Sequence, residues 1–155
     1  MQALHITPLG QRLDLLPLLQ SWFEAEWPGH YGPDGRGDAA ADLRAYAREG
    51  ALPLGLVALR DGHPCGFAAI KTEPFASHPT LGPWAGAAVV PAALRRQGIG
   101  RALLLGLEAQ ARSLRLPRLF CATATSASLL ERCGWQRIDS NASMAIFVKV
   151  IGPAS

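Results

Sequence analysis

Two glycines and three arginines stand together where an apolar run of the chain gives way directly to an amphipathic one. The glycines are Gly98 and Gly100, and the arginines are Arg95, Arg96 and Arg101. Glycine has no Cβ, so its backbone can approach a ligand closely. The first N–H groups of a helix lack internal acceptors and carry the positive end of the helix dipole. This turn is therefore typical of a site for a phosphate or pyrophosphate.

Two common phosphate motifs do not match the turn. A P-loop requires a lysine directly after its second glycine, and this chain has Arg101 there. A dinucleotide fingerprint requires a third small residue, where this chain has Leu103, and an acid at the end of the next strand, where residues 119–123 have none. A basic loop that merely joins a strand to a closely packed helix would have the same composition, so the turn alone leaves that interpretation open.

The composition indicates one domain, residues 1–155. The 155 residues are 49% hydrophobic, which suits a globular protein with a proper core. The net charge of +3 favours a small anionic ligand over nucleic acid, whose sites spread lysine and arginine over a face. No apolar run reaches the ~18 residues of a membrane span. We also find no signal peptide and therefore expect a cytoplasmic protein that binds no membrane.

The cysteines do not suggest a metal site. Cys65, Cys121 and Cys133 are unevenly spaced and form no Cys-x-x-Cys pair. Their neighbours are apolar, as is typical of reduced cysteines in a core. We therefore expect neither a disulfide framework nor a bound metal.

Hydrophobic periodicity predicts the elements that must position the turn. The first helix is expected between a cap at Asp14 and a stop at Pro28, and the second between a cap at Asp38 and a stop at Gly50, with a loop over 28–37. Further helices are predicted at 98–115 and 126–133, and strands at 3–7, 55–59, 65–71, 84–90, 118–123, 135–139 and 144–150. Asp61-Gly62 predicts a hairpin. The order describes a single α/β domain.

The third predicted helix, residues 98–115, has one apolar side. On its other side, Glu108 and Arg112 are expected to form an exposed i,i+4 pair.

Two segments resemble a known family. Residues 90–103, VPAALRRQGIGRAL, resemble the acetyl-CoA-binding motif of the GNAT superfamily of N-acetyltransferases. Residues 130–135, LERCGW, are similar to the family signature YERLGF. The resemblance is specific over residues 84–139, and the element order extends it to the whole chain. It implies a GNAT fold of the α/β (α+β) class, in which four helices flank a mixed, mostly antiparallel sheet of about seven strands.

The resemblance also implies where acetyl-CoA would bind as co-substrate. The amides of the turn would wrap its pyrophosphate, and Val89 and Val90 would run beside the pantetheine where two parallel strands splay apart. Thr123 stands where many members have an asparagine that touches the pantetheine, and the following helix would lie against the thioester arm. The expected cofactor-binding residues are Val89, Val90, Arg95, Arg96, Gln97, Gly98, Ile99, Gly100, Arg101, Thr123, Leu129 and Leu130.

The acid side of catalysis departs from the family pattern. The signature tyrosine, which in many members protonates the departing thiolate, is Leu130 here, and leucine cannot donate a proton. Ser128 or Ser126 would then act through a water, or the thiolate would leave unassisted, since free thiols ionise near pKa ~8.5.

The base side rests on residues outside the signature. An amine must lose a proton before it attacks a thioester, and strand 84–90 has no carboxylate. We expect Glu73 and His78 as candidate bases, with Glu26 and His30 as alternatives. The acceptor pocket is expected from residues 24–37 and 72–83, where Tyr31 would form a wall. Amides near residues 89–91 would stabilise the oxyanion.

The sequence thus predicts an N-acetyltransferase that acts on a primary amine of a small molecule or of a peptide or protein N-terminus. Direct attack in a ternary complex is favoured because no cysteine has a recognisable histidine partner. A non-catalytic acyl-CoA-binding or regulatory module stays the alternative because of Leu130, and a different nucleotide-binding domain is a third. The sequence leaves open whether the chain forms a homodimer.

Overall fold

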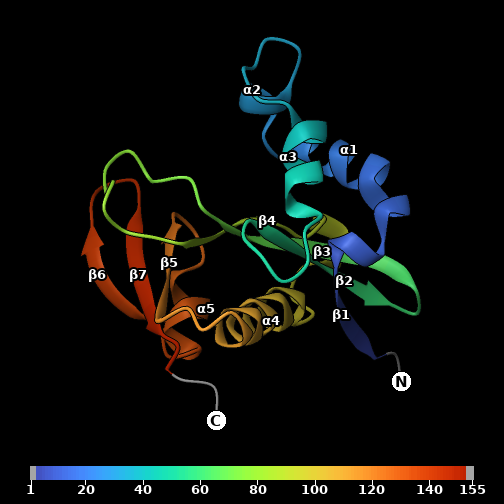
Figure 1. Ribbon diagram of the computed structural model, residues 1–155. Helices are drawn as coiled ribbons and strands as arrows, with labels where there is room; N and C mark the ends of the chain where they lie inside the picture. Colours follow the sequence, from blue (N-terminus) through green and yellow to red (C-terminus); the bar gives the residue numbers. More distant parts are fainter. Residues whose placement is uncertain (1–2, 153–155) are drawn as a thin grey trace.

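A seven-stranded sheet forms the centre of the computed structural model, which describes residues 3–152 (Figure 1). The strands are β1 Leu4–Pro8, β2 Leu54–Arg60, β3 His63–Lys71, β4 Trp84–Val89, β5 Arg118–Thr123, β6 Gln136–Ser140 and β7 Ala145–Val150. Their order in the sheet is β1-β2-β3-β4-β5-β7-β6. All neighbours are antiparallel except β4 and β5, so the predicted mixed, mostly antiparallel sheet is confirmed.

The helices cover both faces of the sheet. They are α1 Leu16–Glu26, α2 Pro28–Tyr31, α3 Ala39–Tyr46, α4 Ile99–Ser113 and α5 Ala127–Arg132. Helices α1 to α3 lie on one face, and α4 and α5 lie on the other (Figure 1). Because both faces are covered, the central strands are apolar throughout rather than alternating.

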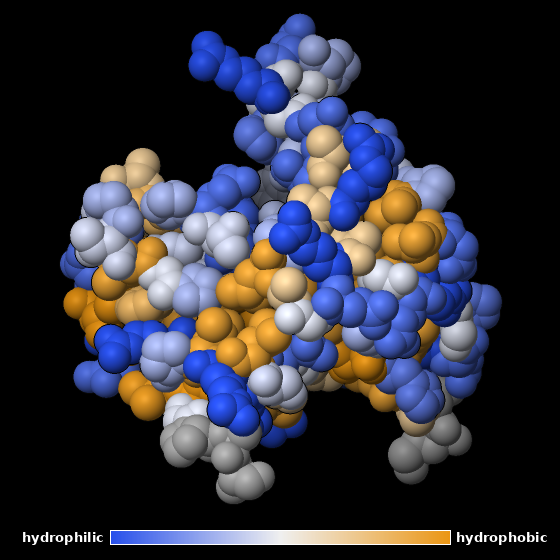
Figure 2. Space-filling view, viewed as in Figure 1, coloured by the Kyte–Doolittle hydropathy of each residue, from blue (hydrophilic) through white to orange (hydrophobic). Residues whose placement is uncertain are grey.

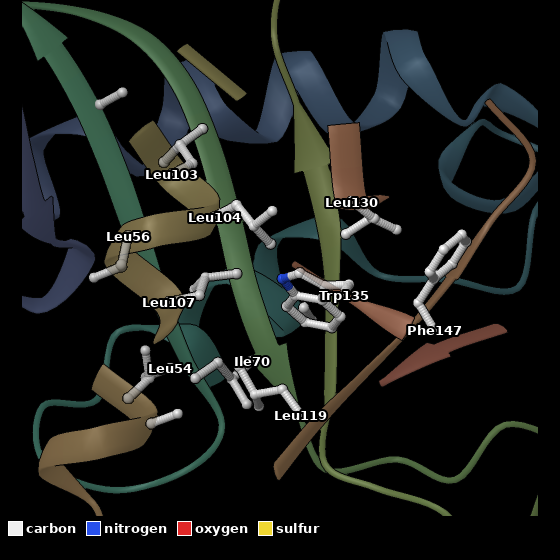
Figure 3. Packing of buried hydrophobic residues seen from close by; sticks show 14 of the residues in the cluster. Leu54, Leu56, Ile70, Leu103, Leu104, Leu107, Leu119, Leu130, Trp135 and Phe147 are labelled. Carbon is white, nitrogen blue, oxygen red and sulfur yellow. The ribbon is translucent and has the colours of Figure 1, made fainter. Parts of the chain in front are cut away.

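Two hydrophobic clusters hold these layers together. Under α1 and α3, Phe23 and Leu43 pack against Phe67 of β3. On the other face, Leu104 and Leu107 of α4 lie against Trp135, which follows α5 (Figure 3). Alternate residues of β3 serve the two clusters, as the two-residue period of a strand requires.

The N-terminal half differs from the expectation at two places. Asp14 does not cap a helix, because it is bound to the guanidinium of Arg12, with Nη2 2.9 Å from Oδ2. α1 begins at Leu16 instead, after a 3₁₀ turn over Leu13–Leu15. Part of the predicted loop 28–37 forms the single turn α2, since proline is well suited to a first helical position.

Two local signals are confirmed. The Asp38 carboxylate accepts a hydrogen bond from the Ala41 amide (3.0 Å) and caps α3. The hairpin at Asp61-Gly62 is present, with φ values of 52° and 78°, and pairs Arg60 with His63.

The predicted exposed pair of Glu108 and Arg112 is wrong. Glu108 is only 5% exposed. It accepts a hydrogen bond from Trp135 Nε1 (3.2 Å), and its Oε1 lies 3.6 Å from Lys149 Nζ. The same ammonium donates to the Cys133 carbonyl (2.7 Å). This carboxylate therefore links α4 to Trp135, which follows α5, and to Lys149 of β7.

No helix within residues 3–152 combines the length and the apolar character needed to cross a membrane. Cys65, Cys121 and Cys133, all within the described residues, are free.

Candidate active site

The sheet opens between β4 and β5. These two parallel strands are paired only at Trp84 and Phe120. On its other edge β4 contains a bulge, because Ala69 pairs with Gly86 while Phe67 pairs with Val89. A bulge bends its strand and leaves the extra residue unpaired. The extra segment includes Ala87 at φ 52°, a left-handed conformation that is unusual for alanine.

A cavity of about 950 Å³ occupies this opening. Its apolar side is formed by α4 residues Leu103, Leu104 and Leu107, and its rim by the basic turn that starts at Arg95. Glu26 from α1 overhangs it from the other face of the sheet. The volume is within the range of cavities that hold drug-sized ligands and cofactors.

The N-terminus of α4 faces this cavity without a cap from its own chain. Gly98 is the N-cap at φ 80°, no side chain bonds to the free amides, and the first turn contains no acid. Nothing lies within 4 Å of the position that a Cβ on Gly98 would occupy. Arg96 and Arg101 are exposed and line the same cavity. The turn can therefore present several N–H donors and two cations to an anion.

The other expected cofactor residues of this segment do not all face the cavity. Arg95 donates from Nε to the Val90 carbonyl (2.8 Å), and its Nη2 lies 3.5 Å from Glu26. Val90 lines the cavity, whereas the Val89 side chain packs under α1 and α3. Gln97 also lies outside the lining and bonds to Arg60. The buried side chain of Ile99 closes the cavity floor.

The far wall is formed by the end of β5 and by α5. The hydroxyl of Thr123 accepts hydrogen bonds from the amides of Thr125 (3.2 Å) and Ser126 (2.8 Å), which fixes the turn into the helix. Leu129 and the buried Leu130 line the cavity. Ser128, the expected acid, does not line it, whereas Ser126 does.

A second cavity of about 440 Å³ lies on the other side of β4. Lys71, Glu73, Phe75 and Trp84 line it, and it shares Ala85, Gly86, Ala87 and Ala122 with the first cavity. Lys71 follows Phe67 and Ala69 on the face of β3 that carries α1 and α3. The molecular surface is notched between the segment after β3 and the projecting α2 (Figure 2). The first cavity thus reaches the opening mainly from the α4 side of the sheet, with Glu26 and Trp27 at its edge, and the second reaches it from the α1 side.

Of the two expected bases, only Glu73 lines a cavity. Burial raises the pKa of Tyr46, and the charges of Asp42 and Glu73 act in the same direction. Burial and a hydrogen bond to Asp42 (2.6 Å) likewise raise the pKa of Tyr31.

His78 lines neither cavity. Its ring nitrogens contact Ser77 Oγ and Asp139 Oδ2, each at 2.8 Å, so it ties the loop after β3 to β6. The alternative base Glu26 lines the first cavity but pairs with Arg95. His30 lines neither cavity and packs its ring edge-on against Tyr31.

Sequence reasoning missed Lys71 and Cys121, which also line the cavities. Lys71 ends a strand whose alternation places it on the α1 side, so strand periodicity could have found it. Burial raises the pKa of the Cys121 thiol to about 12. This thiol is therefore neutral near pH 7 and a poor nucleophile.

A family model described as "Acetyltransferase (GNAT) family" matches residues 16–135. No curated protein matches the chain. Solved structures match it over nearly its full length at low sequence identity.

An aminoglycoside 6'-N-acetyltransferase complexed with coenzyme A is 14% identical, with a TM-score of 0.74 and coverage of 97% of this chain and 99% of that one. The aminoglycoside 6'-N-acetyltransferase from Enterococcus faecium is 15% identical, with a TM-score of 0.73 and the same coverage. The yncA protein from Salmonella typhimurium, solved with acetyl-CoA, is 16% identical, with a TM-score of 0.68 and coverage of 99% and 96%. These likenesses confirm the fold predicted from the sequence.

Proposed function

This chain belongs to the GNAT acetyltransferase family, and we propose that it transfers the acetyl group of acetyl-CoA to a primary amine by direct attack in a ternary complex. The acceptor is a small molecule or a peptide or protein N-terminus. The observation that carries the proposal is the pair of cavities that meet at the opening between β4 and β5. Two reactants that enter from opposite faces can meet there without passing each other.

The first cavity suits acetyl-CoA. The uncapped amides at Gly98 to Arg101 would bind its pyrophosphate, with Arg96 and Arg101 adding charge. The apolar α4 side and Leu129 would contact its pantetheine arm. Bound acetyl-CoA supplies the activated thioester carbonyl. Two structural neighbours are described with coenzyme A or acetyl-CoA, which supports this assignment.

Glu73 is the residue best placed to take the proton of the attacking amine. It lines the second cavity, and the bulge residues Gly86 and Ala87 line the same cavity. Pro91 has no N–H, so the amides of the bulge and of Val90 are the donors left for the developing oxyanion. Glu73→Gln should lower kcat by ~10-fold or more, whereas His78→Ala should chiefly change KM.

The departing thiolate has no tyrosine at Leu130 to protonate it. Ser126 lines the cavity and can act there through a water, in place of the expected Ser128. A covalent relay is disfavoured because the Cys121 thiol, with a pKa of about 12, is neutral. Leu130→Tyr restores the family acid, and a gain in turnover would identify thiolate protonation as the limiting step.

The test has two stages. Acetyl-CoA at about 100 times its Kd should stabilise the protein by ~2.7 kcal/mol in a thermal-shift assay, whereas ATP and NADH should not. Thiol release is then measured with a panel of amines and peptides. A shift with ATP or NADH and none with acetyl-CoA would remove the proposal. Binding without thiol release from any acceptor would support the non-catalytic module that Leu130 favours.

A further inference from the structure

Two opposite charges line the second cavity from one short segment. Lys71 ends β3, and Glu73 follows it in the loop. Within residues 3–152, neither side chain forms an ion pair or a side-chain hydrogen bond, and the two do not pair with each other. The Lys71 ammonium reaches solvent and has no partner among the described residues, so it is free to pair with a ligand that brings a negative charge.

Gly86 helps to place the Lys71 side chain. A Cβ on Gly86 would lie 3.2 Å from Lys71 Cδ, closer than side chains normally pack. Gly86 does not have a positive φ, so its backbone does not require glycine. The missing side chain therefore makes room for the lysine stem to cross β4 beside the bulge.

The rest of the cavity is apolar and aromatic. The ring centroids of Phe75 and Trp84 lie 5.1 Å apart. Trp84 donates its Nε1 hydrogen to the Leu81 carbonyl (3.0 Å), so it presents carbon rather than an unpaired donor. The cavity thus combines a cation, an anion and an apolar wall.

We propose that the acceptor is a free α-amino acid with an apolar side chain, whose carboxylate binds Lys71 and whose ammonium group binds Glu73. Phe75 contacts the side chain. This assignment rests on the proposed function and narrows its substrate class. A peptide N-terminus has an amide in place of the carboxylate and would leave Lys71 without a partner.

The reaction balances with these groups. Glu73 takes a proton from the ammonium group, and the free amine then attacks the thioester carbonyl. A C–N bond forms and the C–S bond breaks. The nitrogen of the adduct then loses its second proton to water, and the departing thiolate of coenzyme A takes up a proton from water. Glu73 returns the first proton to solvent, so one proton is released overall.

The experiment compares each apolar L-amino acid with its amide and with its decarboxylated amine. Calorimetry measures their binding to the protein saturated with coenzyme A, and thiol release measures their turnover. L-phenylalanine should bind at least ~10-fold more tightly than L-phenylalaninamide or 2-phenylethylamine, as expected for one charge-assisted contact. L-leucine should exceed its amide and isoamylamine in the same way.

Variants test which residues cause the preference for a ligand with a carboxylate. Lys71→Met should remove the advantage of the carboxylate while leaving the binding of 2-phenylethylamine within about twofold, whereas Lys71→Arg should keep it. Glu73→Gln should weaken all three compounds. Gly86→Ala should reduce the advantage in part by displacing the lysine stem. Arg118→Met, an exposed cation outside both cavities, is the control and should change nothing.

Equal binding of the three compounds, tighter binding of the amide, an equal loss for all of them in Lys71→Met, or no binding by any L-amino acid would each overturn this inference. Binding that depends on the carboxylate, without thiol release, would uphold the amino-acid site and contradict the proposed acetyl transfer. Turnover of amines without a carboxylate preference would uphold the transfer and contradict the inference.

Discussion

The N-termini of α3 and α4 solve the same physical problem in opposite ways. Each helix begins with amides that have no acceptor in the helix. In α3, the Asp38 carboxylate bonds to the Ala41 amide, and Asp42 adds an acid to the first turn. In α4, the N-cap is Gly98, no side chain bonds to the amides, and the nearby charges are arginines.

This difference separates an end that stabilises the fold from an end that is free for a ligand. At α3 the chain satisfies one amide with its own carboxylate, and the two acids there disfavour an external anion. At α4 the amides face a cavity of about 950 Å³, where water or an external anion can satisfy them. We therefore expect changes at α4 to alter ligand binding and changes at α3 to alter stability.

The largest effect is expected for Gly98→Val. Its methyl groups would fill the open space in front of the amides. Affinity for acetyl-CoA should fall by ~100-fold or more, since several hydrogen bonds to the pyrophosphate would be lost. Calorimetry measures the Kd, and thermal unfolding measures stability.

Gly62→Val is the matched control for this change. Gly62 has a φ of 78° against 80° for Gly98, and it also has open space around it. Both variants should cost ~1–3 kcal/mol of stability from backbone strain. Only Gly98→Val should lose the ligand. Unchanged affinity in Gly98→Val would mean that the phosphate binds elsewhere.

Arg101→Asp is expected to make α4 resemble α3. The acid would favour the helix dipole by ~0.3–1 kcal/mol and repel the phosphates. Acetyl-CoA should bind ~10- to 100-fold more weakly, and the loss should shrink at high salt. The same change at Arg112, in the last turn of α4, should leave the Kd unaltered and slightly destabilise the helix. A similar loss of affinity in both variants would contradict a local effect.

Asp38→Ala tests the capped N-terminus of α3. The free energy of unfolding should fall by ~1 kcal/mol, the usual cost of losing an N-cap, and Asp38→Asn should restore most of it. Urea unfolding measures this change. The Kd for acetyl-CoA should stay at the wild-type value, and a weaker Kd would show that α3 contributes to the cofactor site.

The smallest effect concerns another carboxylate that the chain satisfies itself. The hydrogen bond from His78 lowers the pKa of Asp139 in the folded protein. The contact therefore stabilises the fold above the unfolded pKa of ~3.9 and is lost as pH falls through the folded pKa. The difference in urea midpoint between wild type and Asp139→Asn should narrow below about pH 4. A difference that is constant from pH 3 to pH 6 would contradict this account.

The sequence by itself determined the family and most of the elements, and it predicted an anion site at the glycine- and arginine-rich turn before α4. These features depend on residues close in sequence, such as the glycines before α4, the cap at Asp38 and the Asp61-Gly62 hairpin. A local prediction failed where another side chain competed for the same group. The Asp14 carboxylate pairs with Arg12 and therefore does not cap a helix.

The tertiary structure decided the rest of the site. Periodicity placed Glu108 on an exposed side, but Trp135 and Lys149 come from other elements and enclose it. The bulge at Ala87 and the opening between β4 and β5 depend on strand pairing. That pairing brings Lys71, Glu73 and Trp84 around one cavity. His78 lies outside this cavity and contacts Asp139 of β6. Side-chain partners that are distant in the chain become neighbours only when the sheet is assembled.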